Sequence, residues 1–148
     1  MAWDDREKKE LVLDEGRFLK SYKDQFGNWT IGVGHFLGPN SIYADLVWTD
    51  EQVDSTFEDD FKDAEAEAQS AYKEFLGLDG PRKGALVNMS FQLGYAKFSR
   101  FLNFFNYLDQ GLYKEAAIDL MNTAYARQVP ARAQRIAYRI RTGEYTTR

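Results

Sequence analysis

Few side chains in this sequence of 148 residues can carry out catalysis. Cysteine is absent and histidine occurs once, which excludes a cysteine nucleophile, a thiolate zinc site, a disulfide framework and a multi-histidine metal site. Gly32-Val33-Gly34 resembles part of a phosphate-binding loop, but the remaining glycine and the Lys-Ser/Thr pair are missing. Hydrolysis by paired carboxylates needs none of the missing residues. The sequence therefore favours carboxylate chemistry, with no cofactor and no metal.

Three residues near the N-terminus have suitable types and spacing for such a site. Glu15 ends an expected helix, Asp24 lies in the hairpin that follows, and Thr30 lies on the returning strand, where it could hold a water beside Asp24. A hairpin that folds back on a helix end can bring both carboxylates together. The same spacing also fits a solvated helix residue, a turn-forming aspartate and an ordinary strand threonine, so spacing alone leaves both interpretations open.

The elements that would position these residues can be predicted from local patterns. Residues Trp3–Glu15 are expected to form a helix that stops at Gly16. In Arg17–Leu37, β-forming residues surround a Gly-Asn turn, which predicts a small antiparallel hairpin or three-stranded sheet. Thr49 and Gln52 have the spacing of a capping box, and apolar residues at helical spacing then predict one long helix to about residue 76.

The rest of the chain is predicted to be helical. Asp79-Gly80-Pro81 begins a helix that ends at Gly94. Further helices are expected over Phe98–Leu108, Tyr113–Met121 and Ala131–Thr142. The fold class is therefore α+β and mostly helical. We expect a single domain of residues 1–148, with an N-terminal lobe at about 14–60, a connecting helix at about 50–76, and a helical lobe at about 77–148 packed with the first helix.

The charge distribution is strongly uneven. The formal net charge is −4, but residues 1–80 contain 8 basic and 19 acidic residues, whereas residues 81–148 contain 11 and 4. The net charge taken alone argues against a polyanionic partner, but the chain is a strong charge dipole, and its basic half is the part that could face an anionic polymer. A dense run of aromatic and leucine residues is either an exposed surface for a membrane or a partner, or a helical core. The core is favoured because large exposed apolar patches are rare; the run comprises Phe98, Phe101, Phe104, Phe105, Tyr107 and Leu108.

Several motifs together resemble the T-even phage lysozymes, which are phage-type muramidases of glycoside hydrolase family 24. The N-terminal part of the likeness has the spacing Glu-(8)-Asp-(5)-Thr-Ile-Gly-x-Gly-His. The likeness covers nearly the whole chain and is weakest at residues 38–50. The matching segments are Asp14-Glu15-Gly16, Tyr22-Lys23-Asp24, Gly27, Thr30–His35, Asn88–Gly94, Tyr113–Ala117, Pro130–Ala133 and Arg141–Gly143.

The resemblance implies hydrolysis of the β-1,4 bond between N-acetylmuramic acid and N-acetylglucosamine in peptidoglycan. Glu15 would protonate the leaving oxygen, Asp24 would act on the opposite face of the sugar, and Thr30 would help to position a water there. The family inverts configuration, which requires room for that water between the carboxylates.

Further roles are implied for residues outside the catalytic three. His35 corresponds to a histidine that pairs with a carboxylate on the long helix, here Asp60; the alternative is a catalytic role. Arg132 corresponds to an arginine near the catalytic glutamate that tunes it and bridges the lobes; the alternative is an ordinary surface arginine. Substrate contacts are implied for two residues expected to border the cleft, Phe91 and Gln92, although Phe91 is equally compatible with a core position. They are also implied for Phe36, Phe104 and Asp119, positions at which family members also carry other residues.

The expected partner is peptidoglycan. Nucleic-acid binding is not expected, because the basic residues lack a recognised reading motif. The N-terminus has no apolar segment of the signal-peptide type, and no stretch approaches 18 apolar residues. We therefore expect a protein that is made in the host cytoplasm without membrane insertion and is released to the cell wall by a separate holin-type pore. We also expect a monomer. The leading interpretation is an endolysin. The alternatives are a lysozyme domain of a phage tail protein and a non-catalytic peptidoglycan-binding module.

Overall fold

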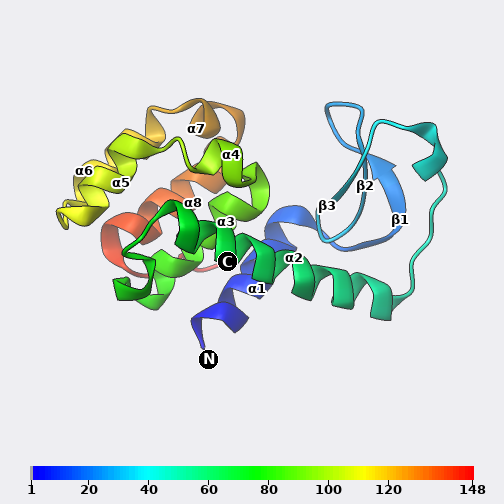
Figure 1. The fold of residues 1–148 in the computed structure, drawn as a ribbon, viewed down its shortest axis with the longest axis horizontal. Coiled ribbons are helices and arrows are strands. Elements are labelled where there is room, and N and C mark those ends of the chain that lie inside the picture. Colours follow the sequence, from blue (N-terminus) through cyan, green and yellow to red (C-terminus); the bar gives the residue numbers. More distant parts are fainter. Residues whose placement is uncertain (1) are drawn as a thin grey trace. The chain divides into compact units, whose positions relative to one another are not determined.

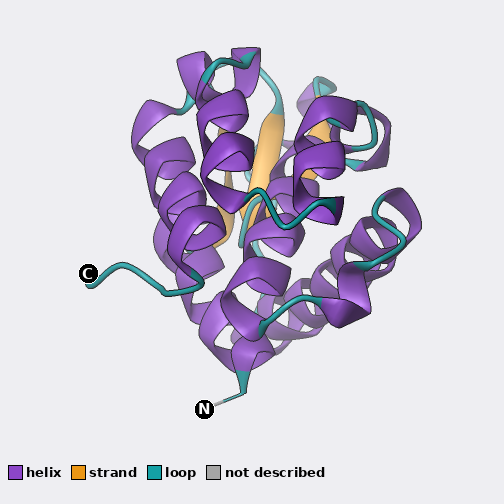
Figure 2. Ribbon diagram, turned by 90° about the vertical axis from the view of Figure 1, so that its left-hand side faces the viewer, coloured by secondary structure: helices purple, strands orange, loops and turns teal. Residues whose placement is uncertain are grey.

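The computed structural model describes residues 2–148, which form a mainly helical chain with one small antiparallel sheet (Figures 1 and 2). This confirms the predicted α+β, mostly helical class. None of the helices in residues 2–148 is long and apolar enough to cross a membrane. The helices are α1 (Trp3–Glu15), α2 (Asp50–Ala71), α3 (Gly80–Leu93), α4 (Tyr95–Phe98), α5 (Leu102–Asp109), α6 (Tyr113–Met121), α7 (Ala124–Gln128) and α8 (Pro130–Thr142), and the strands are β1 (Phe18–Lys23), β2 (Trp29–Gly32) and β3 (His35–Gly38).

The chain divides into two compact units. One, which we call the sheet unit, is Lys8–Asp63. The other, the helical unit, combines the residues up to Glu7 with Ala64–Arg148. Both α1 and α2 therefore contribute residues to each unit.

The sheet unit begins as its local sequence signals predict. Helix α1 stops where Gly16 adopts a positive φ of 77°, and the Gly16 N–H donates to Val12 O at 2.8 Å. The three strands then pair in the order β1-β2-β3, all antiparallel. After the sheet, Asn40 caps a short 3₁₀ turn by accepting a hydrogen bond from Ile42 N–H.

Helix α2 begins with the predicted capping box. Thr49 Oγ1 accepts from Gln52 N–H at 3.1 Å, and Gln52 Oε1 accepts from Thr49 N–H at 2.8 Å. The predicted end near residue 76 is wrong, because the α-helix ends at Ala71 and a 3₁₀ turn follows at Phe75–Gly77. Tyr72 and Phe75 are nonetheless buried. Their three-residue spacing suits a 3₁₀ turn as well as an α-helix, so periodicity could not locate the helix end.

The helical unit begins at a well-capped helix. Asp79 Oδ1 accepts from Arg82 N–H at 3.1 Å at the start of α3, and Gly94, with φ 79°, ends that helix. The prediction of one helix over Phe98–Leu108 is wrong, because α4 ends at Phe98 and α5 starts at Leu102. Tight backbone turns separate the two helices: the Arg100 N–H donates to Lys97 O, and the Phe101 N–H donates to Phe98 O.

The aromatic run on either side of this break contributes to a core. Phe98, Phe104, Phe105 and Leu108 are all buried, which confirms the core interpretation for these residues. Their rings make edge and tilted contacts, with 5.3 Å between the centroids of Phe98 and Phe105. Buried residues from α3, α6 and α8 complete the apolar interior of the unit; they include Leu86, Met89, Leu120, Ile136 and Ile140.

The first turns of α1 contact the segment that follows α8 within the helical unit. Arg6 Nη2 donates to Thr146 O at 3.3 Å. The ring of Tyr145 has the guanidinium carbons of Arg6 and Arg139 at 4.4 and 4.6 Å from its centroid. The first turns of α1 and the segment after α8 are therefore tied together.

Candidate active site

The half-buried carboxylate of Glu15 lies at the C-terminal end of α1, against the backbone of Gly34. A Cβ atom placed on Gly34 would come within 2.6 Å of Glu15 Oε2 and 2.9 Å of its Cδ. Gly34 also has a φ of 62°, in the left-handed region that favours glycine. Both conformation and space therefore require glycine here, and the Glu15 side chain has backbone as its immediate neighbour.

Asp24 is fixed by the turn that joins β1 to β2. Its Oδ1 accepts backbone N–H groups from Phe26 and Asn28, both at 2.9 Å, and its own N–H donates to Asn28 O at 2.8 Å. An aspartate that bonds to the backbone two residues ahead forms an Asx turn. The interpretation of Asp24 as a turn-forming residue is thus correct for its oxygen Oδ1. The other oxygen, Oδ2, takes no part in this turn.

Thr30 is buried at the centre of a row of three side chains that crosses the sheet. It pairs directly with Tyr22 on β1 and with Phe36 on β3. Residues directly opposite each other in antiparallel strands point to the same face. Phe36 is 61% exposed, so the outer member of this row is accessible to a substrate.

His35 belongs to the other face of the sheet, because it pairs with the fully buried Ile31 next to Thr30. Its Nδ1 lies 2.7 Å from Asp60 Oδ2, which is the pair of residues that the resemblance implies. The hydrogen bond to Asp60 is the main cause that raises the pKa of His35, while partial burial opposes the rise. Because His35 lies on the face of the sheet opposite to Thr30, a structural role of this residue is favoured over a catalytic one.

Arg132 takes part in a buried polar network within the helical unit, and its burial excludes the surface alternative. Its Nε donates to Asn88 Oδ1 at 2.9 Å, and Asn88 Nδ2 donates to Glu7 Oε2 at 2.9 Å. Glu7 Oε1 also accepts hydrogen bonds from Arg139 Nη1 and from the Tyr145 hydroxyl. Burial raises the pKa of Glu7 and the charge of Arg139 opposes this. The network fixes the Nε end of the Arg132 guanidinium.

The predicted substrate contacts Phe91 and Gln92 lie at the end of α3, and both are partly exposed. Gln92 Oε1 is buried and accepts no hydrogen bond from residues 2–148. A buried acceptor without a donor is costly, so a substrate N–H could satisfy it. This observation is compatible with the role expected for Gln92.

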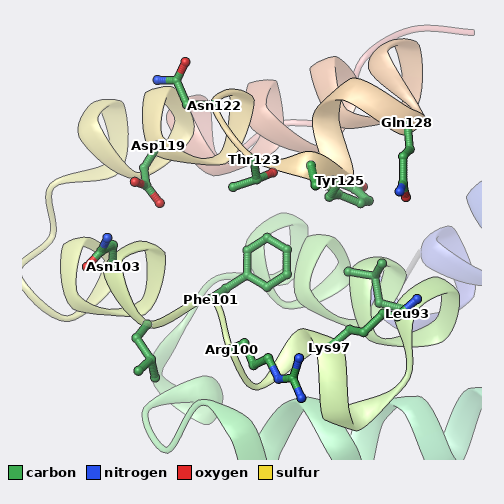
Figure 3. A pocket seen from close by; sticks show the side chains of 12 residues that line it. Leu93, Lys97, Arg100, Phe101, Asn103, Asp119, Asn122, Thr123, Tyr125 and Gln128 are labelled. Atoms are coloured by element: carbon green, nitrogen blue, oxygen red, sulfur yellow. The ribbon is translucent and has the colours of Figure 1, made fainter.

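Asp119 lines a cavity of about 520 Å³ in the helical unit (Figure 3). Asp119, Thr123 and Tyr125 project from the α6–α7 side, while Lys97 and Phe101 project from the α4–α5 side (Figure 3). Cavities of this size with an aromatic wall and a few polar groups are typical of ligand sites. The predicted contact at Asp119 is therefore accessible.

The prediction of Phe104 as a substrate contact is wrong. This residue has no exposed surface, and its ring packs against Phe101 and Phe105 at centroid distances of 6.4 and 5.9 Å. It lies on the same face of α5 as Leu108, one turn further on, and this face is directed into the core. A substrate cannot reach it.

Sequence reasoning did not assign roles to three residues that lie beside, or are linked to, predicted site residues within their own unit. Gly34 was part of the motif, but only the structure shows its contact with Glu15. Tyr22 was likewise noted only as a neighbour of Asp24. Glu7 gave no signal, because a glutamate in an acidic helix normally faces water, and its partners lie 81 to 138 residues away.

Comparisons with known proteins find several similar sequences. A family model described as phage lysozyme matches residues 13–137. "Probable T4-type lysozyme 2" of Dictyostelium discoideum is 30% identical over 90% of this chain and 92% of its own length. "Probable T4-type lysozyme 1" of the same organism is 29% identical with the same coverage. "Peptidoglycan hydrolase gp36" of Pseudomonas phage phiKMV is 27% identical over 86% of this chain but only 14% of its own length.

Proposed function

The chain belongs to the phage lysozyme family, and on that premise we propose that it is a peptidoglycan hydrolase of the muramidase type. It cleaves the β-1,4 bond between N-acetylmuramic acid and N-acetylglucosamine. Glu15 is the general acid, Asp24 acts on the opposite face of the sugar, and Thr30 positions a water. No cofactor takes part in this proposal.

The observation that carries the proposal is that the fold constrains all three residues within one compact unit. Glu15 lies against the Gly34 backbone, Oδ1 of Asp24 is held by two N–H groups, and Thr30 is buried in the central strand. Preorganised groups contribute to catalysis because they need not be reordered when the bond breaks. An exposed pair of ordinary surface carboxylates would not be fixed in this way.

The reaction needs the two carboxyl groups in opposite protonation states. Glu15 holds the proton that passes to the leaving oxygen, and ionised Asp24 accepts a proton from the attacking water. Because the water attacks from the face opposite to the leaving group, the product has inverted configuration at the anomeric carbon. Thr30 restricts the position of that water, and the exposed Phe36 beside it offers an apolar surface to the sugar.

Digestion of purified murein tests the proposal. We expect reducing-end N-acetylmuramic acid by mass spectrometry, and the inverted anomer as the first product by NMR. Glu15→Gln should lower the rate by roughly 10²–10⁴-fold. Glu51→Gln, an exposed glutamate at the start of α2, is the matched control and should retain activity. Anhydro products would contradict hydrolysis, and binding to murein without cleavage would favour a non-catalytic module.

The biological role that we propose is lysis of a bacterial host by a monomeric enzyme that reaches the wall through a separate pore. The alternative is a lysozyme domain within a longer protein. The relative from Pseudomonas phage phiKMV favours this alternative, because the matching region is 14% of its length. Expression in bacteria separates the two. An endolysin should cause lysis only when the inner membrane is permeabilised in the presence of the protein, and it should do so without any attached domain.

A further inference from the structure

Tyr22 occupies a position on the sheet from which its side chain can reach the proposed attacking water. Its direct partner across the β1–β2 ladder is Thr30. Side chains of such a pair share a face, with Cβ atoms about 4.5–5.5 Å apart. Asp24 follows two residues later and continues the ladder through its 2.8 Å bond to Asn28, so it lies on the same side as Tyr22. Tyr22, Asp24 and Thr30 therefore surround one region of the sheet.

The ring of Tyr22 is held in place by its neighbour Phe18. The two ring centroids are 4.7 Å apart with an interplanar angle of 56°. Phe18 in turn lies against Gly16, because a Cβ atom on that glycine would come within 2.6 Å of the Phe18 ring. Gly16 directly follows Glu15. The Tyr22 ring thus packs against Phe18, which lies against the end of α1, the helix that carries Glu15.

The hydroxyl group of Tyr22 remains a neutral donor. Partial burial is the main cause that raises the pKa of this phenol, and the negative charges of Glu15 and Asp24 raise it further. The group therefore keeps its proton at neutral and mildly alkaline pH. It therefore supplies an O–H donor that stays protonated over the pH range in which carboxyl groups gain or lose protons.

We propose that Tyr22 is a water-positioning residue of the candidate active site, whose hydroxyl donates a hydrogen bond to the attacking water. This inference rests on the proposed function. A water has two protons and two lone pairs. If its protons point to Asp24 and to Thr30 Oγ1, and one lone pair accepts the Tyr22 hydrogen bond, the other lone pair is directed at the anomeric carbon. In the reaction one water proton passes to Asp24 and the Glu15 proton passes to the leaving oxygen, while Tyr22 keeps its own.

The variant Tyr22→Phe tests this role because it removes the hydroxyl and leaves the ring packed on Phe18. We expect kcat on murein to fall roughly ten- to a hundredfold, since a poorly oriented water reacts more slowly. KM should stay within about twofold, because a water contact does not bind the sugar. Tyr43→Phe makes the same chemical change elsewhere in the sheet unit and should leave kcat unchanged. The midpoint of thermal unfolding should move by less than about 2 °C in both variants.

The pH profile gives a readout that a purely structural role would not reproduce. Removing a neutral donor should lower kcat by the same factor from pH 5 to pH 8 and leave the shape of the profile unchanged. A displaced ring would instead shift the profile, because it would change the surroundings of Glu15 and Asp24.

Three results would overturn the inference while leaving the proposed function intact: an unchanged kcat in Tyr22→Phe, a loss confined to KM, or a shifted profile. A wild-type protein that releases no reducing ends from murein would overturn the proposed function, and the role of Tyr22 with it.

Discussion

Replacing Gly34 with alanine would place a methyl group against the Glu15 carboxylate. The new Cβ atom would lie 2.6 Å from Oε2, whereas ordinary contacts begin at 3.4 Å, so the carboxylate or the turn between β2 and β3 must shift by about 0.8 Å. A misplacement of about 1 Å in an active site can cost roughly 10²-fold in rate. We therefore expect kcat/KM on murein to fall about a hundredfold, which corresponds to about 2.7 kcal/mol of transition-state stabilisation.

The variant also places alanine in the left-handed region, which costs about 1–2 kcal/mol of stability. Gly111→Ala is the matched control. Its φ of 70° is close to the 62° of Gly34, but no atom lies within 4 Å of its added Cβ. Both variants should lose the free energy of unfolding that the positive φ costs, Gly34→Ala should also lose that of the clash, and only Gly34→Ala should lose activity.

The assay is the initial rate of reducing-end release from purified murein, measured beside urea unfolding of the same preparations. Two results would refute the reasoning. One is a Gly34→Ala variant with the wild-type kcat/KM. The other is a Gly111→Ala variant that loses as much activity as Gly34→Ala, since the effect would then come from general destabilisation.

Three further predictions follow from the contacts and charges. The raised pKa of His35 means that its bond to Asp60 stabilises the fold below pH about 6.5 and that this contribution is lost as pH rises through the folded-state pKa. Asp60→Asn should therefore cost more stability at pH 5.5 than at pH 8 in urea unfolding, and an equal cost at both values would contradict this. Glu7→Ala should cost about 3–5 kcal/mol because it leaves the buried Arg139 unpaired, whereas Glu7→Leu combined with Arg139→Met should restore most of that stability in the same measurement. The rate of murein digestion should fall with added salt, less steeply than for a uniformly cationic lysozyme, because only residues 81–148 carry a net positive charge; a rate indifferent to salt would remove that role for the charge asymmetry.

The sequence predicts structure best where the signal is local. Gly16 ends α1, Thr49 caps α2 and Gly143 ends α8 in the left-handed conformation, all as their neighbours indicate. Helix α7 was missed, although Thr123 accepts a hydrogen bond from Ala126 N–H at its start. A helix of five residues is too short for periodicity to reveal.

Predictions fail where tertiary contacts decide the outcome. The apolar residues of α1 are sparse and include Leu11, Val12 and Leu13. Leu11 is fully buried, but Leu13 is 60% exposed, and Glu7 is buried instead. A charged group can be buried only if hydrogen-bonding partners compensate for its lost hydration. The partners of Glu7 come from α3, α8 and the C-terminal segment. Periodicity within one helix contains no information about them.

The same distinction applies to the candidate site. Glu15, Asp24 and Thr30 could be named from a motif, because their spacing reflects a short hairpin. The neighbours that fix them could not be named in the same way. The approach of Gly34 to Glu15 depends on the path of the chain between β2 and β3, and the position of Tyr22 opposite Thr30 depends on strand register.

During synthesis, Glu7 leaves the ribosome long before the residues that bind it. Arg139 follows 132 residues later, an interval of roughly 7–26 s at about 5–20 residues per second. Until then the Glu7 carboxylate is hydrated and the first turns of α1 lack their partners from the end of the chain. The same helix ends at Glu15. A nascent chain that already contains the whole sheet unit therefore carries Glu15, the proposed general acid, on a helix not yet anchored, and the proposed hydrolytic activity should appear only when translation has passed α8.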